Sequence, residues 1–444
     1  MMKLMKQPTP TVKKPSAKTA TSHTMDDANL DLYCKSKIHP IFTDALDVKN
    51  IHIVPIYDRT KTISVKEKND KLFNHKRPTA EIIDGEGFVY VFPGKDYVRH
   101  YAKIYRQQGF DVTVHDFDES DIRAAVASVF PKKFPTVDTV VLGYVQPLVD
   151  EGEWQGDNDI FWKVQQVGNA SVAFVGVEFS YWGDIIYYVI EQLAKKTKQV
   201  IYIGKLGSLD KKDIPNKTIA SGNISHVDGK EVQWKNIFEK SPLITKGKHI
   251  SIPSVLDETH QWFLQNRDEY RFVDPEIGWA AKSCQDNDTA FSYLHLVTDN
   301  LHGHFIEDLT NERDKNVLEK RLQYVGIIKA ILWHAIANEE VSLSAAVLQA
   351  QQVRVDRGLM RPLQRDWQAC LSFAYHTQEE AWEIVRELPR REWKDQEVVP
   401  ERLLSEIVDT QIQLLTTLAY AGFSEQDLID GVLEKLQAKR KDWK

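Results

Sequence analysis

The strongest constraint on the fold of this chain is a change of pattern near residue 340. Before it, short apolar runs typical of strands alternate with amphipathic helical segments, and after it only helical patterns follow. Alternating strands and helices indicate an α/β unit, whereas helices alone indicate a bundle. The chain has 444 residues, which is too long for one ordinary core. The sequence therefore predicts an α/β domain with a mixed sheet, followed by an all-α helical bundle.

Four segments follow from this pattern. Residues 1–25 hold five lysines and no acid, which predicts a disordered basic tail. Residues 26–83 are an N-terminal extension, residues 84–338 the α/β domain and residues 342–444 the helical domain. Strands are expected at 51–56, 87–92, 110–115, 137–144, 171–177, 199–203, 217–221, 249–252 and 291–297, and helices at 96–108, 118–130, 184–195, 258–266, 314–338, 342–355, 365–375, 377–388, 401–420 and 425–440.

Composition excludes several classes of function. A net charge of −7 and a pI near 6.1 argue against a broad nucleic-acid-binding surface. Three cysteines, far apart in the chain, fit a reducing compartment without a disulfide framework. The sequence has no run of about 18 apolar residues, so no membrane span is expected. A cytoplasmic protein is the resulting expectation.

Two pairs of acids near the C-terminus form the most informative motif. Glu380 and Glu383 stand three residues apart, Glu406 and Asp409 do the same, and 22 residues separate the pairs. On a helix, residues i and i+3 share a face, and prolines between the pairs favour two helices that fold against each other. Four carboxylates at one point need a cation. Mg²⁺ is the first candidate and Mn²⁺ the alternative. A solvated acidic helix face is the competing interpretation.

The two acidic pairs resemble the signature of the all-α nucleoside triphosphate pyrophosphohydrolases, which include MazG and the dimeric dUTPases. The resemblance covers roughly residues 342–444. It implies that the four acids hold Mg²⁺, which activates a water that attacks the α-phosphorus and releases pyrophosphate. Trp393 and Lys394 follow the first acidic helix, and the closing basic helix contributes Lys435 and Arg440, so the resemblance implies that these four contact the substrate. Family members usually dimerise, so a homo-oligomer is expected.

Three stretches of the α/β segment resemble the nucleoside phosphorylase superfamily. The strand at 199–203 leads into a glycine-rich stretch with Gly204, Gly207 and Ser208, where a turn with free backbone N–H groups is expected to hold an anion. Residues 272–278 place Glu276 where the family binds the ribose hydroxyls, although Pro275 replaces the usual Met. Residues 296–300 place Asp299 where the family presents the acid that protonates the base. A tight turn, a surface acid and a helix cap are the competing interpretations.

The resemblance implies cleavage of an N-glycosidic bond, with Asp299 as general acid and Glu276 holding the sugar. The family's usual arginine before the glycine-rich stretch is absent, since Tyr202 stands there, and no Gly-Asp-x-x-Arg phosphate loop is found. Hydrolysis and phosphorolysis therefore both remain open.

The two resemblances together suggest a bifunctional nucleotide-degrading enzyme. The helical domain would convert a triphosphate to a monophosphate and pyrophosphate, and the α/β domain would cut the base from the sugar. Nucleotide-pool cleaning and nucleotide depletion against phage are the two roles considered. In the alternative hypothesis, the α/β domain is a non-catalytic nucleotide sensor that regulates the pyrophosphohydrolase. A purely structural dimerisation bundle is the third.

Overall fold

The computed structural model describes residues 22–44, 47–57, 76–149, 152–157, 159–241, 243–303, 315–337, 365–387 and 400–423, with a few isolated positions beyond residue 346. The basic tail expected over residues 1–25 lies outside these ranges up to residue 21. The helices expected over 342–355 and 425–440 fall almost entirely outside them as well. Four predicted substrate-binding residues lie outside the described residues: Trp393, Lys394, Lys435 and Arg440.

A four-stranded sheet forms the N-terminal part of the fold. Its order is β2-β3-β1-β4, with β1 (Asn50–Pro55), β2 (Thr79–Ile83), β3 (Glu86–Val91) and β4 (Asp111–Val114). Strand β1 runs parallel to β3 and β4, and β2 runs antiparallel to β3. The domain boundary expected at residue 84 thus falls in the β2–β3 turn, and the N-terminal extension supplies two strands.

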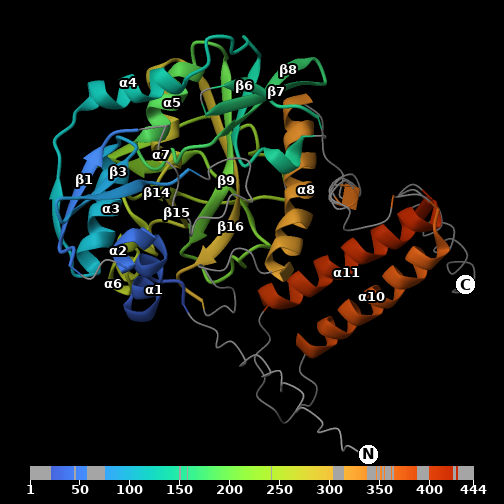
Figure 1. The fold of residues 1–444 in the computed structure, drawn as a ribbon. Helices are drawn as coiled ribbons and strands as arrows, with labels where there is room; N and C mark the ends of the chain where they lie inside the picture. Colours follow the sequence, from blue (N-terminus) through green and yellow to red (C-terminus); the bar gives the residue numbers. More distant parts are fainter. Residues whose placement is uncertain are drawn as a thin grey trace, which may run out of the picture.

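Helices lie on and beside this smaller sheet (Figure 1). Helix α3 (Lys95–Gln107) packs on β1, β3 and β4, and α1 (Asp27–Lys37) packs on α3. The short α2 (Pro40–Asp44) contacts β2, and α4 (Glu119–Val129) contacts α5. The side chain of Asp118 accepts hydrogen bonds from the backbone N–H groups of Ser120 and Asp121, which fixes the start of α4. The helices predicted over 96–108 and 118–130 are thereby confirmed.

A mixed twelve-stranded sheet is the centre of the molecule. Its main path is β12-β11-β14-β15-β9-β5-β8-β7-β6, and β16 joins β9 to β10, which in turn pairs with β13. Strand β9 runs parallel to β5 and β16 but antiparallel to β15. The strands are β5 (Thr139–Gly143), β6 (Gln155–Asp157), β7 (Ile160–Val167), β8 (Ala170–Val177), β9 (Gln199–Ser208), β10 (Ile219–Ser221), β11 (Ile224–Val227), β12 (Lys230–Gln233), β13 (Thr245–Lys246), β14 (His249–Ser251), β15 (Phe272–Asp274) and β16 (Ala290–Asn300).

Helices cover both faces of this sheet, as Figure 1 shows. Helices α5 (Ile185–Leu193) and α7 (Ile277–Asp286) pack on each other and belong to one core. Helix α8 (Lys315–Ala337) packs with β7 and β16 in a second core, where Trp333 stacks on Phe174. The short α6 (His260–Asn266) contributes Phe263 to a third cluster. Apolar residues on both faces explain why the central strands read as continuous apolar runs.

The glycine-rich stretch after residue 203 is not a turn, which corrects the sequence prediction. Strand β9 continues to Ser208, and Gly204 and Gly207 pair with His295 and Asp299 of β16. A Cβ atom on Gly204 would lie 2.7 Å from His295 Nε2. The glycine is therefore explained by a close side-chain approach within a strand rather than by a bend of the backbone.

Two helices form an antiparallel hairpin at the C-terminal side, α10 (Trp367–Glu387) and α11 (Pro400–Ala421), which pack side by side (Figure 1). The sequence predicted two helices over 365–375 and 377–388, but α10 is continuous. Thr377, where the second was expected to begin, donates its hydroxyl to the carbonyl oxygen of Phe373 one turn earlier, so it does not cap a new helix. The overall prediction, a mixed-sheet α/β part followed by helices, is confirmed. Within the described ranges, no helix has the length and apolar character needed to cross a bilayer.

Candidate active sites

The first candidate site begins where α3 and α5 meet. Asp184, just before α5, accepts hydrogen bonds from the backbone N–H groups of Lys95 and Asp96 at 2.9 and 3.1 Å. Its carboxylate therefore occupies the N-terminus of α3, which attracts anions. Asp96 accepts a 2.8 Å hydrogen bond from Trp279 Nε1. Burial and the charge of Asp184 raise the pKa of Asp96 to about 7. Two buried carboxylates thus share one corner of this site.

Glu276 lies at the start of α7, beside this corner. The Oδ1 atom of Asp274 accepts hydrogen bonds of 2.9 and 2.8 Å from the backbone N–H groups of Glu276 and Ile277. These bonds fix the first turn of the helix. Burial, followed by the charges of Asp274 and Asp96, raises the pKa of Glu276 well above its usual range. The backbone N–H of Gly183 donates to the Glu276 carboxylate and partly offsets that effect. Glu276 is thus held in place by its neighbours, and is not a loosely held surface residue.

Asp299 is held on β16, opposite Gly207. A register shift between Val297 and Asp299 places the carboxylate there, within the strand and not after it. The Oδ1 atom of Asp299 accepts a 2.5 Å hydrogen bond from the hydroxyl group of Thr298. Its Oδ2 atom lies 3.2 Å from the position that a Cβ on Gly207 would take. Buried Glu258 lies near enough that the charge of Asp299, after burial itself, raises the Glu258 pKa well above its usual range.

The predicted residues of the α/β part lie on adjacent strands. Gly207 of β9 pairs with Val273 of β15 on one side and with Asp299 of β16 on the other. The charge of Asp274 raises the pKa of the predicted acid Glu276 and also that of Glu258, whose pKa the predicted acid Asp299 raises as well. Ser208 is used differently: its hydroxyl donates a 2.6 Å hydrogen bond to Asp213, away from these acids.

Several acids and two histidines of this site were missed in the sequence. His249 Nε2 lies 3.1 Å and His295 Nε2 3.8 Å from the carboxylate of Asp274, and all three side chains are almost completely buried. Burial lowers the pKa of His295 to about 4, so this imidazole is neutral at pH 7. A polar residue inside an apolar strand, such as His295, was the available signal. The missed residues are Asp96, Asp184, His249, Glu258, Asp274 and His295.

The second candidate site is the acid cluster of α10 and α11, defined as Glu380, Glu383, Glu406 and Asp409. Three of its members, Glu380, Glu406 and Asp409, are partly buried and can each place one oxygen within 4.8 Å of the others. Glu383 is exposed but shares a hydrogen bond with Glu406. The helical hairpin therefore brings the two predicted pairs together.

The electrostatics of the acid cluster fit a hard divalent cation. Burial and neighbouring carboxylates raise the pKa of Glu380, and burial with the help of Glu383 and Asp409 raises the pKa of Glu406 to about 7. Such shifts mean that the negative charge is not fully compensated by the protein. Carboxylate oxygens at this spacing are the ligands that Mg²⁺ and Mn²⁺ prefer. These residues could therefore hold such an ion.

One cation from the α/β part reaches the acid cluster. Lys217 Nζ lies 2.5 Å from Asp409 Oδ2 and 3.0 Å from Ser405 Oγ. Tyr324 of α8 is close as well, because burial and the charges of Asp409 and Glu406 raise its pKa. Lys217 lies 192 residues from Asp409 in the chain, so no local pattern pointed to this contact.

A separate pocket opens near the end of β9. It is lined by charged side chains, among them Lys248, Arg271 and Asp210. Lys248 is paired with Glu231 and Glu269, and Arg271 is paired with Asp213. The lining includes none of the predicted site residues, so the pocket is not part of either candidate site.

Comparisons with known proteins give partial likenesses. No family model matches the chain. A curated relative, oxidoreductase cns1 from Cordyceps militaris, is 22% identical over 263 residues, which is 49% of this chain and only one third, 33%, of that protein.

Among solved structures, a putative methylthioadenosine nucleosidase from Weissella paramesenteroides is 14% identical and covers 46% of this chain and 99% of its own, with a TM-score of 0.34. An S-adenosylhomocysteine nucleosidase from Streptococcus pyogenes is 12% identical over 47% of this chain and 100% of its own, with a TM-score of 0.34. A methylthioadenosine phosphorylase from Schistosoma mansoni is 12% identical over 50% of this chain and 97% of its own, also at 0.34. At these TM-scores the likenesses do not assign the chain to a family.

Proposed function

We propose that this chain degrades nucleotides at two sites. The α/β part cleaves the N-glycosidic bond of a nucleoside or nucleotide, and the helical hairpin hydrolyses a nucleoside triphosphate to a monophosphate and pyrophosphate. The observation that supports it best is the geometry of the acid cluster, where two sequence pairs 22 residues apart place three carboxylate oxygens within 4.8 Å. The acids on β15, α7 and β16 support the first activity.

Asp299 and Glu276 divide the work of the glycosidic step. Asp299 donates a proton to the departing base nitrogen while the bond between that nitrogen and the anomeric carbon breaks. Glu276 accepts hydrogen bonds from the sugar hydroxyls and faces the positive charge that develops on the sugar. Gly207 leaves room beside this acid, because a Cβ there would lie 3.2 Å from the Asp299 carboxylate.

Water is the nucleophile that the α/β site favours over phosphate. The N-terminus of α3, a natural place for an anion, is already taken by the carboxylate of Asp184. Asp96, Asp274 and Glu276 add further acidic groups nearby, and any that is ionised repels a phosphate. The proposal is therefore hydrolysis: the water oxygen bonds to the anomeric carbon, and its proton is released to solvent.

In the helical hairpin, Glu380, Glu406 and Asp409 would hold Mg²⁺ or Mn²⁺, with Glu383 beside them. The bound ion would neutralise the triphosphate and lower the pKa of a water. Glu383 is exposed and shares a hydrogen bond with Glu406, so it is placed to accept a proton from that water. The water oxygen bonds to the α-phosphorus as the bond to the pyrophosphate oxygen breaks.

A nucleotide screen tests both activities at once. Each NTP and dNTP is incubated with the full chain and Mg²⁺, and free base and pyrophosphate are resolved by chromatography. Both products are expected, with base release lost in Asp299→Asn and pyrophosphate release lost in Asp409→Asn. Pyrophosphate without free base would remove the first activity. No products, with Asp409→Asn identical to wild type, would overturn the whole proposal.

The second candidate function for the α/β part is that of a nucleotide sensor. The contact of Lys217 with Asp409 favours this role, because the contact joins the α/β part to the helical hairpin. Calorimetric binding of a nucleoside without turnover, together with a changed rate of pyrophosphate release, would support this role. Unchanged pyrophosphate release after deletion of residues 1–338 would contradict it.

A homo-oligomer also stays a prediction. Four large side chains on α10 are each more than half exposed and would suit a second copy of the chain: Trp367, Leu371, Tyr375 and Trp382.

A further inference from the structure

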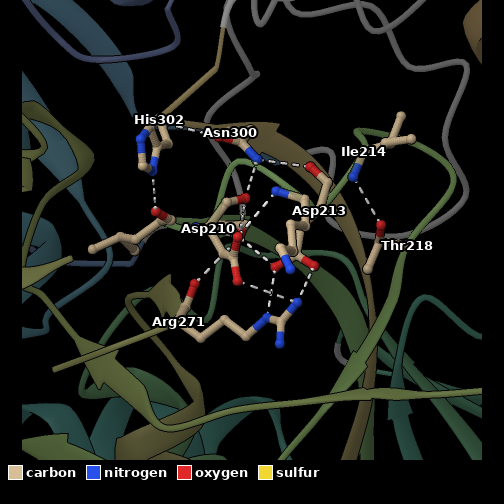
Figure 2. Close-up of polar contacts among 10 residues, drawn as sticks. Asp210, Asp213, Ile214, Thr218, Arg271, Asn300 and His302 are labelled. Carbon is tan, nitrogen blue, oxygen red and sulfur yellow. Dashed lines mark hydrogen bonds and ion pairs between the residues drawn. The ribbon is translucent and has the colours of Figure 1, made fainter. Parts of the chain in front are cut away.

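The segment between β9 and β10, residues 209–218, is here called the Lys217 loop. Its first half is fixed by Asp213, whose two carboxylate oxygens accept hydrogen bonds from Arg271 Nη2 and Nε at 2.7 and 2.9 Å (Figure 2). Ser208 donates to the same carboxylate at 2.6 Å. A bidentate, largely buried pair of this kind restricts the loop more than a surface ion pair does.

Both halves of the loop are also fixed to β16 or α8. Asn300 Nδ2 donates to the carbonyl oxygens of Asp210 and Asp213, both at 2.7 Å, as Figure 2 shows. The backbone N–H of Asn216 donates a 2.7 Å hydrogen bond to the carbonyl oxygen of Val297 in β16. Its side-chain oxygen accepts a 2.7 Å hydrogen bond from Nε of Arg321 in α8. The backbone on each side of Lys217 is therefore held by the α/β part, which presents this one side chain in a set direction.

The ammonium group of Lys217 lies where a cation of the acid cluster would lie. It contacts Asp409 Oδ2 directly, and its charge lowers the pKa of both Glu406 and Glu380. The side chains of Lys217 and Asp409 are only 20% and 17% exposed, so solvent screens this interaction weakly. A divalent ion ligated by Asp409 would lie within a few ångströms of the ammonium and repel it.

We propose that Lys217 is a built-in competitor of the divalent cation at the acid cluster. In this arrangement the α/β part holds the helical hairpin in a lysine-neutralised resting state, and metal binding must displace Lys217 before triphosphate hydrolysis begins. This inference rests on the proposed function of the acid cluster and names its regulation. The two effects are linked: a change that weakens the contact of Lys217 with Asp409 strengthens metal binding, and metal binding weakens that contact between the α/β part and the helical hairpin.

Mn²⁺ affinity of the full chain is the direct test, measured by the electron paramagnetic resonance of free Mn²⁺. Lys217→Met keeps the length and apolar stem of the side chain but removes the charge. It is expected to bind Mn²⁺ at least about tenfold more tightly than wild type, which corresponds to about 1.4 kcal/mol. Lys211→Met removes the same charge from an exposed position of the same loop and should match wild type. Melting curves verify that each variant is folded.

The outcomes separate this inference from the function on which it rests. Equal or weaker Mn²⁺ binding by Lys217→Met, with wild type binding normally, overturns the inference alone. Unchanged Mn²⁺ affinity with weaker binding of a non-hydrolysable triphosphate would make Lys217 a phosphate contact, which also overturns it. If no variant binds Mn²⁺ and Asp409→Asn behaves as wild type, the proposed metal site fails, and the inference fails with it.

Discussion

The two groups of carboxylates in this chain are kept together by different physics. In the α/β part, burial is the first cause of the raised pKa values of Asp96 and Glu276, and the charge of a neighbouring carboxylate is the second and adds to it. In the helical hairpin, burial is also the first cause for Glu406, but the second is the charge of Lys217, which contacts Asp409 and lowers the pKa of Glu406. Carboxylates held close together relieve their repulsion by holding a proton or by gaining a counter-ion.

This difference indicates different chemistry. Acids that retain protons near neutral pH are suited to donating one to a leaving group. Acids that remain short of positive charge are suited to holding a cation. We therefore propose proton transfer at the α/β site and metal binding at the acid cluster, and each of the following predictions tests one side of that division.

The largest effect is expected from Asp299→Asn, which keeps the size of the side chain but removes its proton. Base release should fall by about 10²–10⁴-fold, the usual contribution of a general acid. Pyrophosphate release should stay within about twofold of wild type, because Asp299 is not among the acids of the helical hairpin. Both rates come from one chromatographic assay. Loss of both activities in a folded variant would contradict the division between the sites.

Asp409→Asn tests the other side of the comparison. The amide removes a cation ligand, so pyrophosphate release should fall by at least about 10²-fold at fixed Mg²⁺, which exceeds the usual loss on altering a supporting residue of a metal site. Base release from a nucleoside should be unchanged. Thr410→Ala, on the next position of α11, is the matched control, since Thr410 donates only to a backbone carbonyl. Equal losses in both variants would point to damage to the helix and not to the metal.

The sequence predicted the layout of the fold well because periodicity is a local property. The helix over 314–338 and the strand over 171–177 agree with α8 and β8 within a few residues. The acid cluster was predictable for the same reason, since Glu406 and Asp409 share a helix face whatever surrounds them.

What the sequence did not reveal depends on contacts between distant segments. Strands β6 and β7, whose pairing is set by the sheet, were missed. Asp96 and Asp184 meet across 88 residues, and Lys217 reaches Asp409 across 192. No local pattern encodes such a meeting, because tertiary packing creates it.

The pH dependence of stability tests whether burial of Asp96 favours its protonated form. The pKa of Asp96 is raised from 3.8 to about 7, so its protonated form is favoured by the fold. Its stabilising contribution is complete below about pH 4 and is lost as the pH rises towards 7. At about 1.36 kcal/mol per pH unit this amounts to on the order of 4 kcal/mol.

Asp96→Asn should therefore remove this dependence. The side-chain oxygen of the amide can still accept the hydrogen bond from Trp279 Nε1, but the amide does not ionise. Urea unfolding at pH 8 should therefore show a larger free energy of unfolding for the variant than for wild type, with little difference at pH 4. Saturating Mg²⁺ should leave this difference unchanged, because the Asp96 site is not the proposed metal site. A constant difference at every pH would mean that the carboxylate is not protonated in the folded chain.

The smallest effect tests whether Gly204 is needed for a close approach or for a turn. Its backbone lies in a strand, and a Cβ there would meet His295 Nε2 at 2.7 Å. Gly204→Ala should therefore destabilise the fold by about 1–3 kcal/mol through overpacking, as measured by urea unfolding. If the cause is this contact, the same substitution should cost much less in a His295→Ala background, where the imidazole is gone. A cost independent of His295 would instead indicate that the backbone itself requires glycine, and the turn predicted from the sequence would then be the better description of residues 204–208.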